Sequence, residues 1–322
     1  MSLKVYAPAT CANLNVGFDV LGVALQPIDG SLLGDVVTIE EGSIDTPTPV
    51  LYVEGPFAHR LPHDPAKNLA SVGWRRFNEL LKEKGVKQRP LRLTLNKALP
   101  VGSGLGSSAC SVVATLHGLN LSYGEPLTRG ELLRLMGELE GSVSGAVHYD
   151  NVAPSYLGGL QLIMQEGAQL SGQLPCFDDW RWVLCNPGTS LSTAEARAVM
   201  PSHYPREDCL SYGRSLASFI HALHTQDHAL ATRLLRDVIA EPYRAPLLPA
   251  LTRLRAYASE QPKLLATGIS GAGPTLFALV HCEELAGRVA SWMRANLIES
   301  EEGFTVVCSL DQRGARQIEG AP

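Results

Sequence analysis

A glycine-rich segment in the first half of the chain has the composition of a loop that binds phosphate. It reads PVGSGLGSSAC and lies between an alternating apolar stretch and a helical one. Glycine lets successive backbone amides approach a polyphosphate closely, and a following helix N-terminus adds free N–H donors and the positive end of its dipole. We therefore predict a nucleotide phosphate site, with a tight strand-to-helix turn as the alternative. The residues predicted to contact the nucleotide are Pro100, Val101, Gly102, Ser103, Gly104, Leu105, Gly106, Ser107, Ser108, Ala109 and Cys110.

Two common phosphate-binding motifs do not fit this loop. A Walker A loop ends in Gly-Lys-Ser/Thr, whereas this one ends Gly106-Ser107-Ser108 and contains no lysine. A dinucleotide fingerprint has the spacing G-x-G-x-x-G, whereas Gly102, Gly104 and Gly106 are each two residues apart, and no acidic residue follows at the end of a second strand. The segment is therefore a phosphate loop of a different kind.

The elements expected around the loop follow from local patterns. An opening strand should end at Pro8, and the alternating stretch PLRLTLNKALP predicts a strand that leads into the loop. Apolar residues at helical intervals predict a helix over Asn68–Lys84 closed by Gly85, one after the loop, and one over Thr128–Glu140. Thr128 and Glu131 have the spacing of a capping box. Further expected strands are VVTIEEG, LYVEG and a pair within YLGGLQLIM.

The second half repeats a mixed pattern after a polar stretch from Gln165 to Asp179, which we take as a domain boundary. We predict a domain over 1–165 that carries the loop and a second over 166–322. Strands and helices alternate there without a fixed repeat, which predicts an α+β fold. The expected elements are strands WRWVLCNP, LLATGIS, TLFALV and FTVVCSL and helices over 192–198, 210–224, 229–238, 247–260 and 283–296.

Composition limits the classes of function. The 322 residues have a formal net charge of −5, so no broad basic field is available for nucleic acid or an anionic membrane surface. The most apolar stretch, near residues 264–280, is broken by three glycines and Pro274, and the chain start has no apolar signal region. Seven scattered cysteines form no C-x-x-C pair. We expect a cytoplasmic protein with reduced thiols.

Three motifs, in order along the chain, resemble those of the GHMP kinases, a family named for galactokinase, homoserine kinase, mevalonate kinase and phosphomevalonate kinase. APATCANLNVGFD at residues 7–19 resembles the first motif, the glycine loop resembles the second, and GISGAGPT at residues 268–275 resembles the third. The strings HYDNVAP, STAEARA and EPYRAPLLP are similar to the homoserine kinase branch. Cys11, Asn15 and Ala272 depart from the usual residues of these motifs without replacing a proposed ligand-binding side chain.

The resemblance implies a two-domain GHMP kinase fold, with a ribosomal S5 domain 2-like N-terminal domain, a ferredoxin-like C-terminal domain and a cleft between them. It implies ATP-dependent phosphorylation of the L-homoserine side-chain hydroxyl to O-phospho-L-homoserine, a step in threonine biosynthesis. ATP and Mg²⁺ are the implied cofactors, with Ser108 and Glu140 as metal ligands, since magnesium prefers hard oxygen ligands. Homoserine kinases are often dimers, which leaves a homodimer open.

Further roles carried over by resemblance concern a zwitterionic substrate, which needs a carboxylate for its ammonium group and guanidinium groups for its carboxylate. Asn13 and Asp19 from the first motif, and Arg197 and Arg244 from the second half, supply these types. The substrate-binding set is Asn13, Asp19, His148, Arg197 and Arg244.

The hydroxyl end of the substrate is implied to contact the catalytic set Asn151, Thr193 and His148. Counting from Glu140 places Asn151, rather than Asp150, where mevalonate kinases have an aspartate. An amide is no general base, so positioning and charge stabilisation should carry most of the rate, with the proton passing to the phosphate. Two alternatives stay open, a kinase of another small alcohol and an inactive binding protein with the same fold.

Overall fold

The computed structural model describes residues 2–42, 50–144, 147–167 and 169–319. One sheet contains the strand that leads into the glycine loop and has the order β13-β1-β4-β6-β5. Strands β5 and β6 are parallel, and the other neighbours are antiparallel. Its strands are β1 (Ser2–Pro8), β4 (Gly34–Glu41), β5 (Val50–Glu54), β6 (Leu91–Asn96) and β13 (Arg316–Gln317).

A second sheet joins the two halves of the chain and has the order β10-β11-β9-β12-β3-β7-β8, with β2 paired to β3. The second half of the chain has a ferredoxin-like arrangement, as predicted. Its elements follow one another as β9, helices, β10, β11, α10 and β12, and its strands are antiparallel in the order β10-β11-β9-β12. The strands are β2 (Thr10–Ala12), β3 (Leu21–Pro27), β7 (Leu160–Glu166), β8 (Gln169–Leu174), β9 (Arg181–Asn186), β10 (Ala266–Ile269), β11 (Leu276–Val280) and β12 (Phe304–Leu310).

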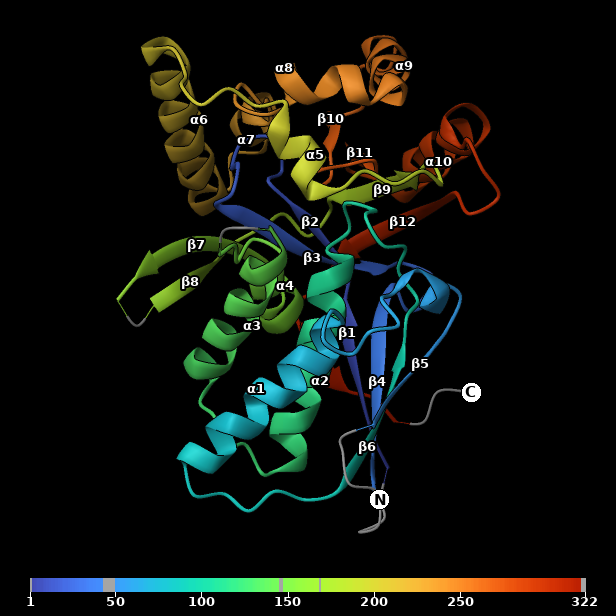
Figure 1. Ribbon diagram of the computed structural model, residues 1–322. Helices are drawn as coiled ribbons and strands as arrows, with labels where there is room; N and C mark the ends of the chain where they lie inside the picture. The colour runs from blue at the N-terminus through green and yellow to red at the C-terminus, as the bar shows by residue number, and fades with distance from the viewer. Residues whose placement is uncertain (1, 43–49, 145–146, 168, 320–322) are drawn as a thin grey trace.

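Helices cover both sheets. In Figure 1, α1 to α4 lie together on one side of the first sheet, where α2 packs on β1 and β4, and α9 and α10 lie over the ferredoxin-like part. The helices are α1 (Leu69–Glu83), α2 (Ser107–Ser122), α3 (Arg129–Ser144), α4 (Val152–Leu157), α5 (Thr193–Ala198), α6 (Arg206–Thr225), α7 (His228–Leu234), α8 (Glu241–Arg244), α9 (Pro249–Ser259) and α10 (Glu283–Leu297), with short 3₁₀ turns at Ala58–Arg60 and Ala245–Leu247. None of the described helices is long and apolar enough to cross a membrane.

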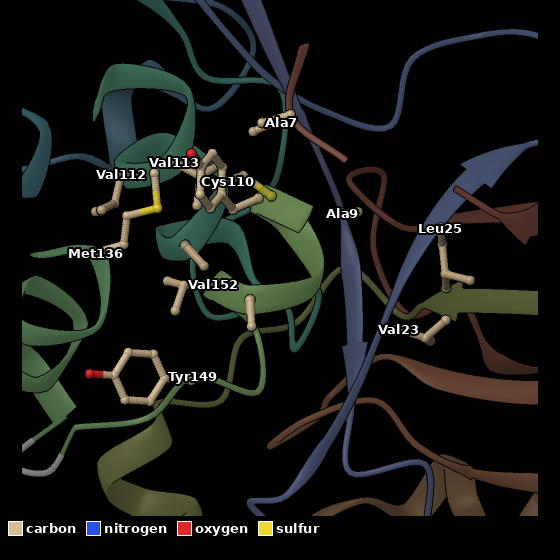
Figure 2. Close-up of a cluster of buried hydrophobic side chains, with 14 of the residues drawn as sticks. Ala7, Ala9, Val23, Leu25, Cys110, Val112, Val113, Met136, Tyr149 and Val152 are labelled. Carbon is tan, nitrogen blue, oxygen red and sulfur yellow. The ribbon is translucent and has the colours of Figure 1, made fainter. Parts of the chain in front are cut away.

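The hydrophobic core runs from the first sheet into the second, so the glycine loop stands on a packed base. Helix α2 is buried along most of its length, and apolar residues and small or buried polar residues occur on all its sides. Figure 2 shows part of this core, with side chains from the first strands and from helices α2, α3 and α4: Ala7, Ala9, Val23, Leu25, Cys110, Val112, Val113, Met136 and Val152.

Most predicted elements are present, and several bounds needed correction. Helix α3 continues to Ser144, so Glu140 lies one turn before its end rather than at it. The predicted strand pair within YLGGLQLIM was wrong, because Tyr156 and Leu157 belong to helix α4 and only β7 is a strand in this segment. The polar stretch taken as a boundary contains β8, and β2, β3, α8 and β13 were not predicted. The division into 1–165 and 166–322 stays a prediction.

Candidate active site

The glycine loop leads from β6 into the predicted helix α2, which begins at Ser107. Gly102, Gly104 and Gly106 have φ values of 69°, 78° and 65°, a left-handed conformation that glycine adopts readily. Gly106 is the N-cap residue and its position has no side-chain cap, so the first amides of α2 remain for a ligand. The side chains of Leu105, Ala109 and Cys110 lie in the core, which leaves only their backbone groups for a nucleotide.

The third motif packs directly against this loop. The Ser270 hydroxyl donates to the Gly104 carbonyl at 2.7 Å, and the Thr275 N–H donates to the Ser103 carbonyl at 3.1 Å. A Cβ atom at Gly104 would lie 2.4 Å from the Ser270 carbonyl oxygen, so a larger residue would displace one of the two loops. The sequence motifs therefore form one structural unit.

The first motif forms a tight turn between β2 and β3. Asn13, Asn15 and Asp19 all have positive φ, which asparagine and aspartate tolerate better than most residues. The Asn13 side chain accepts a hydrogen bond from the Asp19 N–H and donates one to the Gly271 carbonyl. Asn13 thus fixes Asp19 and links the turn to the third motif.

Asn15 occupies space over a glycine of the third motif. Its Nδ2 donates to the carbonyls of Leu235 and Thr267, and a Cβ atom at Gly268 would lie 1.9 Å from its Oδ1. The unusual asparagine is therefore structural, and glycine at 268 makes room for it.

Asp19 forms an ion pair with Arg197 of α5. The two guanidinium nitrogens lie 2.8 and 3.2 Å from the two carboxylate oxygens, and both side chains are about one third exposed. Ser192 caps α5 in a capping box with Glu195, which orients this short helix. Asp19, predicted to bind the ammonium group of a zwitterion, thus lies beside Arg197, predicted to bind its carboxylate.

Arg244 is the second guanidinium, and it is only 2% exposed. Its nitrogens donate to the Ala196 carbonyl, the Gly271 carbonyl and the Met200 sulfur, and among the described residues no carboxylate forms an ion pair with it. Burial, and then the charge of Arg197, lower its pKa below the usual value. A buried cation with no paired carboxylate favours an anionic ligand nearby.

The phenyl ring of Phe18 lies against both arginines, with guanidinium carbons 5.7 and 5.3 Å from the ring centre. Phe18 directly precedes Asp19 in the first motif, a position that the sequence interpretation did not assign. Its ring provides a cation–π contact to each arginine.

Asn151 connects this region to the glycine loop. Its Oδ1 accepts a hydrogen bond of 2.8 Å from the Thr10 hydroxyl and would lie 3.0 Å from a Cβ atom at Gly106. Because the oxygen is used by Thr10, the amide group is left to donate. The neighbouring Asp150 is buried, and that burial, reinforced by Asp19, raises its pKa to about 7.

His148 lies close to Asp19, with its Nδ1 3.9 Å from Asp19 Oδ2. Burial lowers its pKa, although the charge of Asp19 acts in the opposite direction. The buried Nε2 of His148 and the Nε of Arg197 have no hydrogen-bond partner within the described ranges. Two such atoms in one place favour a polar ligand or water there.

The two predicted metal ligands are adjacent. The Ser108 hydroxyl hydrogen bonds to the Glu140 carboxylate, and burial raises the pKa of Glu140 above its usual value. A magnesium ion would relieve this cost of burial, and two hard oxygen donors beside a phosphate loop fit such an ion. The described residues contain no group of three or more His, Cys, Asp and Glu residues that could bind a metal.

One pocket contains all eight predicted site residues that lie outside the glycine loop. It has a volume of about 90 Å³, several times the space that one buried water needs, so it suits a small polar molecule. Asp150, Gly271 and Ala272 also line it; the sequence interpretation named Asp150 and Ala272 without a site role. The predicted residues in the pocket are Asn13, Asp19, Glu140, His148, Asn151, Thr193, Arg197 and Arg244.

Comparisons with known proteins identify the family of the chain. Residues 69–159 match the family GHMP kinases N terminal domain, and residues 219–299 match GHMP kinases C terminal. The crystal structure of homoserine kinase from Cytophaga hutchinsonii is similar over 98% of this chain and 97% of its own, with 30% identity and a TM-score of 0.88.

Two further structures share the fold. A putative homoserine kinase from Listeria monocytogenes is 24% identical, with a TM-score of 0.71 over 99% of this chain and 100% of its own. Streptococcus pneumoniae phosphomevalonate kinase, solved with phosphomevalonate and AMPPNP, is 15% identical, with a TM-score of 0.69 over 95% of this chain and 100% of its own. The chain belongs to the GHMP kinase family, whose kinases are ATP-dependent phosphotransferases.

Proposed function

We propose that this protein phosphorylates the side-chain hydroxyl of L-homoserine with ATP and magnesium, which yields O-phospho-L-homoserine. The observation that carries the proposal is the buried Arg244, which pairs with no carboxylate of the described residues and lies with Arg197 and Asp19 around a small pocket. A zwitterion with a short side chain matches these charges. The similarity to a homoserine kinase structure at 30% identity supports the same substrate.

In this proposal the substrate carboxylate binds Arg244 and Arg197, and its ammonium group binds Asp19. The Asp19–Arg197 pair is partly exposed, so opening it costs at most about 1 kcal/mol. The bound zwitterion would replace that pair with two new ones. Specificity for a molecule that carries both charges follows from this exchange.

The hydroxyl end of the substrate would lie beside Asn151, His148 and Thr193, next to Gly106 of the loop. Asn151 donates through its amide and orients the hydroxyl, while the loop amides hold the phosphates. A magnesium ion on Ser108 and Glu140 supplies neutralisation of phosphate charge when it is bound. Alignment and charge stabilisation then carry the rate, and the proton passes to the phosphate.

ATP turnover measured against homoserine, mevalonate, serine and threonine tests the proposal, with the phosphorylated product identified by phosphorus NMR. We expect the highest kcat/KM with homoserine and phosphate on its side-chain oxygen. A higher kcat/KM for mevalonate would assign the protein to another alcohol. Nucleotide binding without turnover of any acceptor would favour a binding protein instead.

A further inference from the structure

An ion pair lies completely inside the protein beneath the glycine loop. The Lys97 ammonium group is 2.5 Å from Asp35 Oδ2, and the two side chains are 1% and 0% exposed. Lys97 directly follows β6 and lies three residues before the loop begins. Asp35 belongs to β4, which pairs with β6. At this burial the ammonium group makes no direct contact with a ligand in the pocket. Its charge acts on Glu140 toward a lower pKa, and its hydrogen bonds act on the loop.

The pair is bonded to both ends of the loop. Before the loop, Asp35 Oδ1 accepts from the N–H groups of Ala98 and Leu99 at 3.0 and 3.2 Å. At the end of the loop, where α2 begins, Lys97 donates to the Ser107 carbonyl at 2.7 Å and to the Ser111 hydroxyl at 3.0 Å.

Side-chain hydroxyls add two further links. Ser111 donates to Asp35 Oδ2 at 2.6 Å, and Ser107 donates to the Leu99 carbonyl at 3.2 Å. The chain on either side of the loop is thus bonded to one buried charge centre.

A buried ion pair is a poor way to gain stability, because the desolvation of two charges offsets their attraction. Apolar residues of similar size at such sites are often neutral or stabilising. The Asp35–Lys97 pair does something that apolar residues would not do, since each charge makes directional bonds to backbone groups at a fixed position. These backbone groups flank the amides that face the expected phosphates.

We propose that Asp35 and Lys97 form a positioning clamp, which holds the two ends of the glycine loop at a fixed separation so that its amides are preorganised for phosphate. The proposal rests on the proposed function, because it takes the loop as the nucleotide site. Lys97 fixes the position of the first turn of α2 through its bond to the Ser107 carbonyl. Asp35 fixes the last residues before the loop through its bonds to the N–H groups of Ala98 and Leu99. Without the clamp the loop would pay an ordering cost each time a nucleotide binds.

The double variant Asp35→Asn with Lys97→Met tests the clamp without leaving a single buried charge. Asparagine keeps an oxygen for the N–H groups of Ala98 and Leu99, whereas the ammonium bond to Ser107 is lost. We expect the Kd of AMPPNP, measured by calorimetry, and the KM for ATP to rise about tenfold, the size of one charge-assisted hydrogen bond. The KM for homoserine should stay within about twofold of the parent value.

Asp311→Asn with Arg316→Met is the matched control. Asp311 is fully buried, pairs with Arg316 and also accepts backbone N–H groups, but at the turn between β12 and β13. This variant should lose stability in thermal unfolding and keep the AMPPNP affinity of the parent. If the role of Lys97 were only structural, both double variants would lose stability and keep the AMPPNP affinity of the parent.

Ser111→Ala provides a second route, since it removes two bonds of the clamp and no charge. It should raise the Kd of AMPPNP by about twofold to fivefold, and it decides the question if the clamp double variant does not fold. Parent-like AMPPNP affinity in the folded double variant, or in Ser111→Ala, would overturn the clamp and leave the proposed function intact. Failure of the parent protein to bind AMPPNP would overturn both.

Discussion

Replacement of Arg244 by methionine should weaken recognition of the substrate carboxylate. Arg244 is almost fully buried and donates to the carbonyls of Ala196 and Gly271. Methionine retains much of the apolar stem and removes the charge and every donor. Its effect should therefore fall on the charged end of the substrate and not on the nucleotide.

The expected magnitude follows from the contacts. A charge-assisted hydrogen bond to a carboxylate contributes about 1.5–3 kcal/mol, which is a tenfold to hundredfold change in affinity. The two carbonyls that lose a donor would cost stability of about 1–3 kcal/mol each if they stay dry. Unfolding should therefore be measured beside kinetics, so that a loss of folded protein is not counted as a loss of binding.

The assay compares kcat/KM for homoserine with that for 3-aminopropan-1-ol, the same molecule without its carboxylate. The parent should prefer homoserine strongly, and Arg244→Met should lose about tenfold to hundredfold of that preference while its KM for ATP changes little. Arg253→Met is the control, because Arg253 is about half exposed on α9 and pairs with Glu299. An equal preference in the parent and in Arg244→Met would refute the carboxylate assignment.

Three further outcomes are expected. Glu140→Gln should lower kcat by about a hundredfold with little loss of fold, which a magnesium titration checks; parent-like activity at limiting magnesium would contradict the metal assignment. Gly104→Ala should weaken AMPPNP binding about tenfold, because its Cβ would lie 2.4 Å from the Ser270 carbonyl oxygen, whereas Gly124→Ala has a similar positive φ and open space and should not. Asp150 has a raised pKa of about 7, so the parent should lose stability as pH rises from about 4 to about 7. Asp150→Asn should not show that loss, so its free energy of unfolding in urea, relative to the parent, should be higher at about pH 8 than at about pH 5. An equal difference at the two pH values would contradict the assignment.

Local signals in the sequence predicted the elements that carry their own end markers. Asn68 caps α1 by accepting from the Ala70 N–H, and Gly85 follows that helix with a φ of 69°. Thr128 and Glu131 form the predicted capping box at the start of α3. These features depend on neighbours within four residues, so a single sequence contains the information.

Elements defined by distant partners were missed. Strand β13 has two residues and exists because it pairs with β1, and β8 lies in a polar stretch but pairs along β7. The four residues of α8 carry Arg244 and have no period of their own. Length and pattern are too weak in such segments, and tertiary pairing decides their structure.

The candidate site shows the same division between local and distant information. The resemblance to the GHMP kinases implied a zwitterion site beside a phosphate loop, and the structure brings the residues of that site into one pocket. From the sequence alone it was not evident that Arg244 pairs with no carboxylate of the described residues, or that the Phe18 ring contacts both Arg244 and Arg197. Both facts depend on how α5, α8 and the first motif meet in space.

The direction of the Asn151 side chain bears on how the acceptor hydroxyl loses its proton. The Thr10 hydroxyl donates to Asn151 Oδ1, the atom that faces Gly106, so the Nδ2 group of Asn151 is a donor and takes no proton. Asp150 is the nearest carboxyl group in sequence, and burial raises its pKa to about 7, which leaves much of it protonated near neutral pH. Glu140 is committed to Ser108 and, in our proposal, to magnesium. Each of these groups is better suited to orientation or charge balance than to proton abstraction. This supports a transfer in which alignment by Asn151 and neutralisation of the phosphates do most of the catalysis, and the phosphate itself takes the proton.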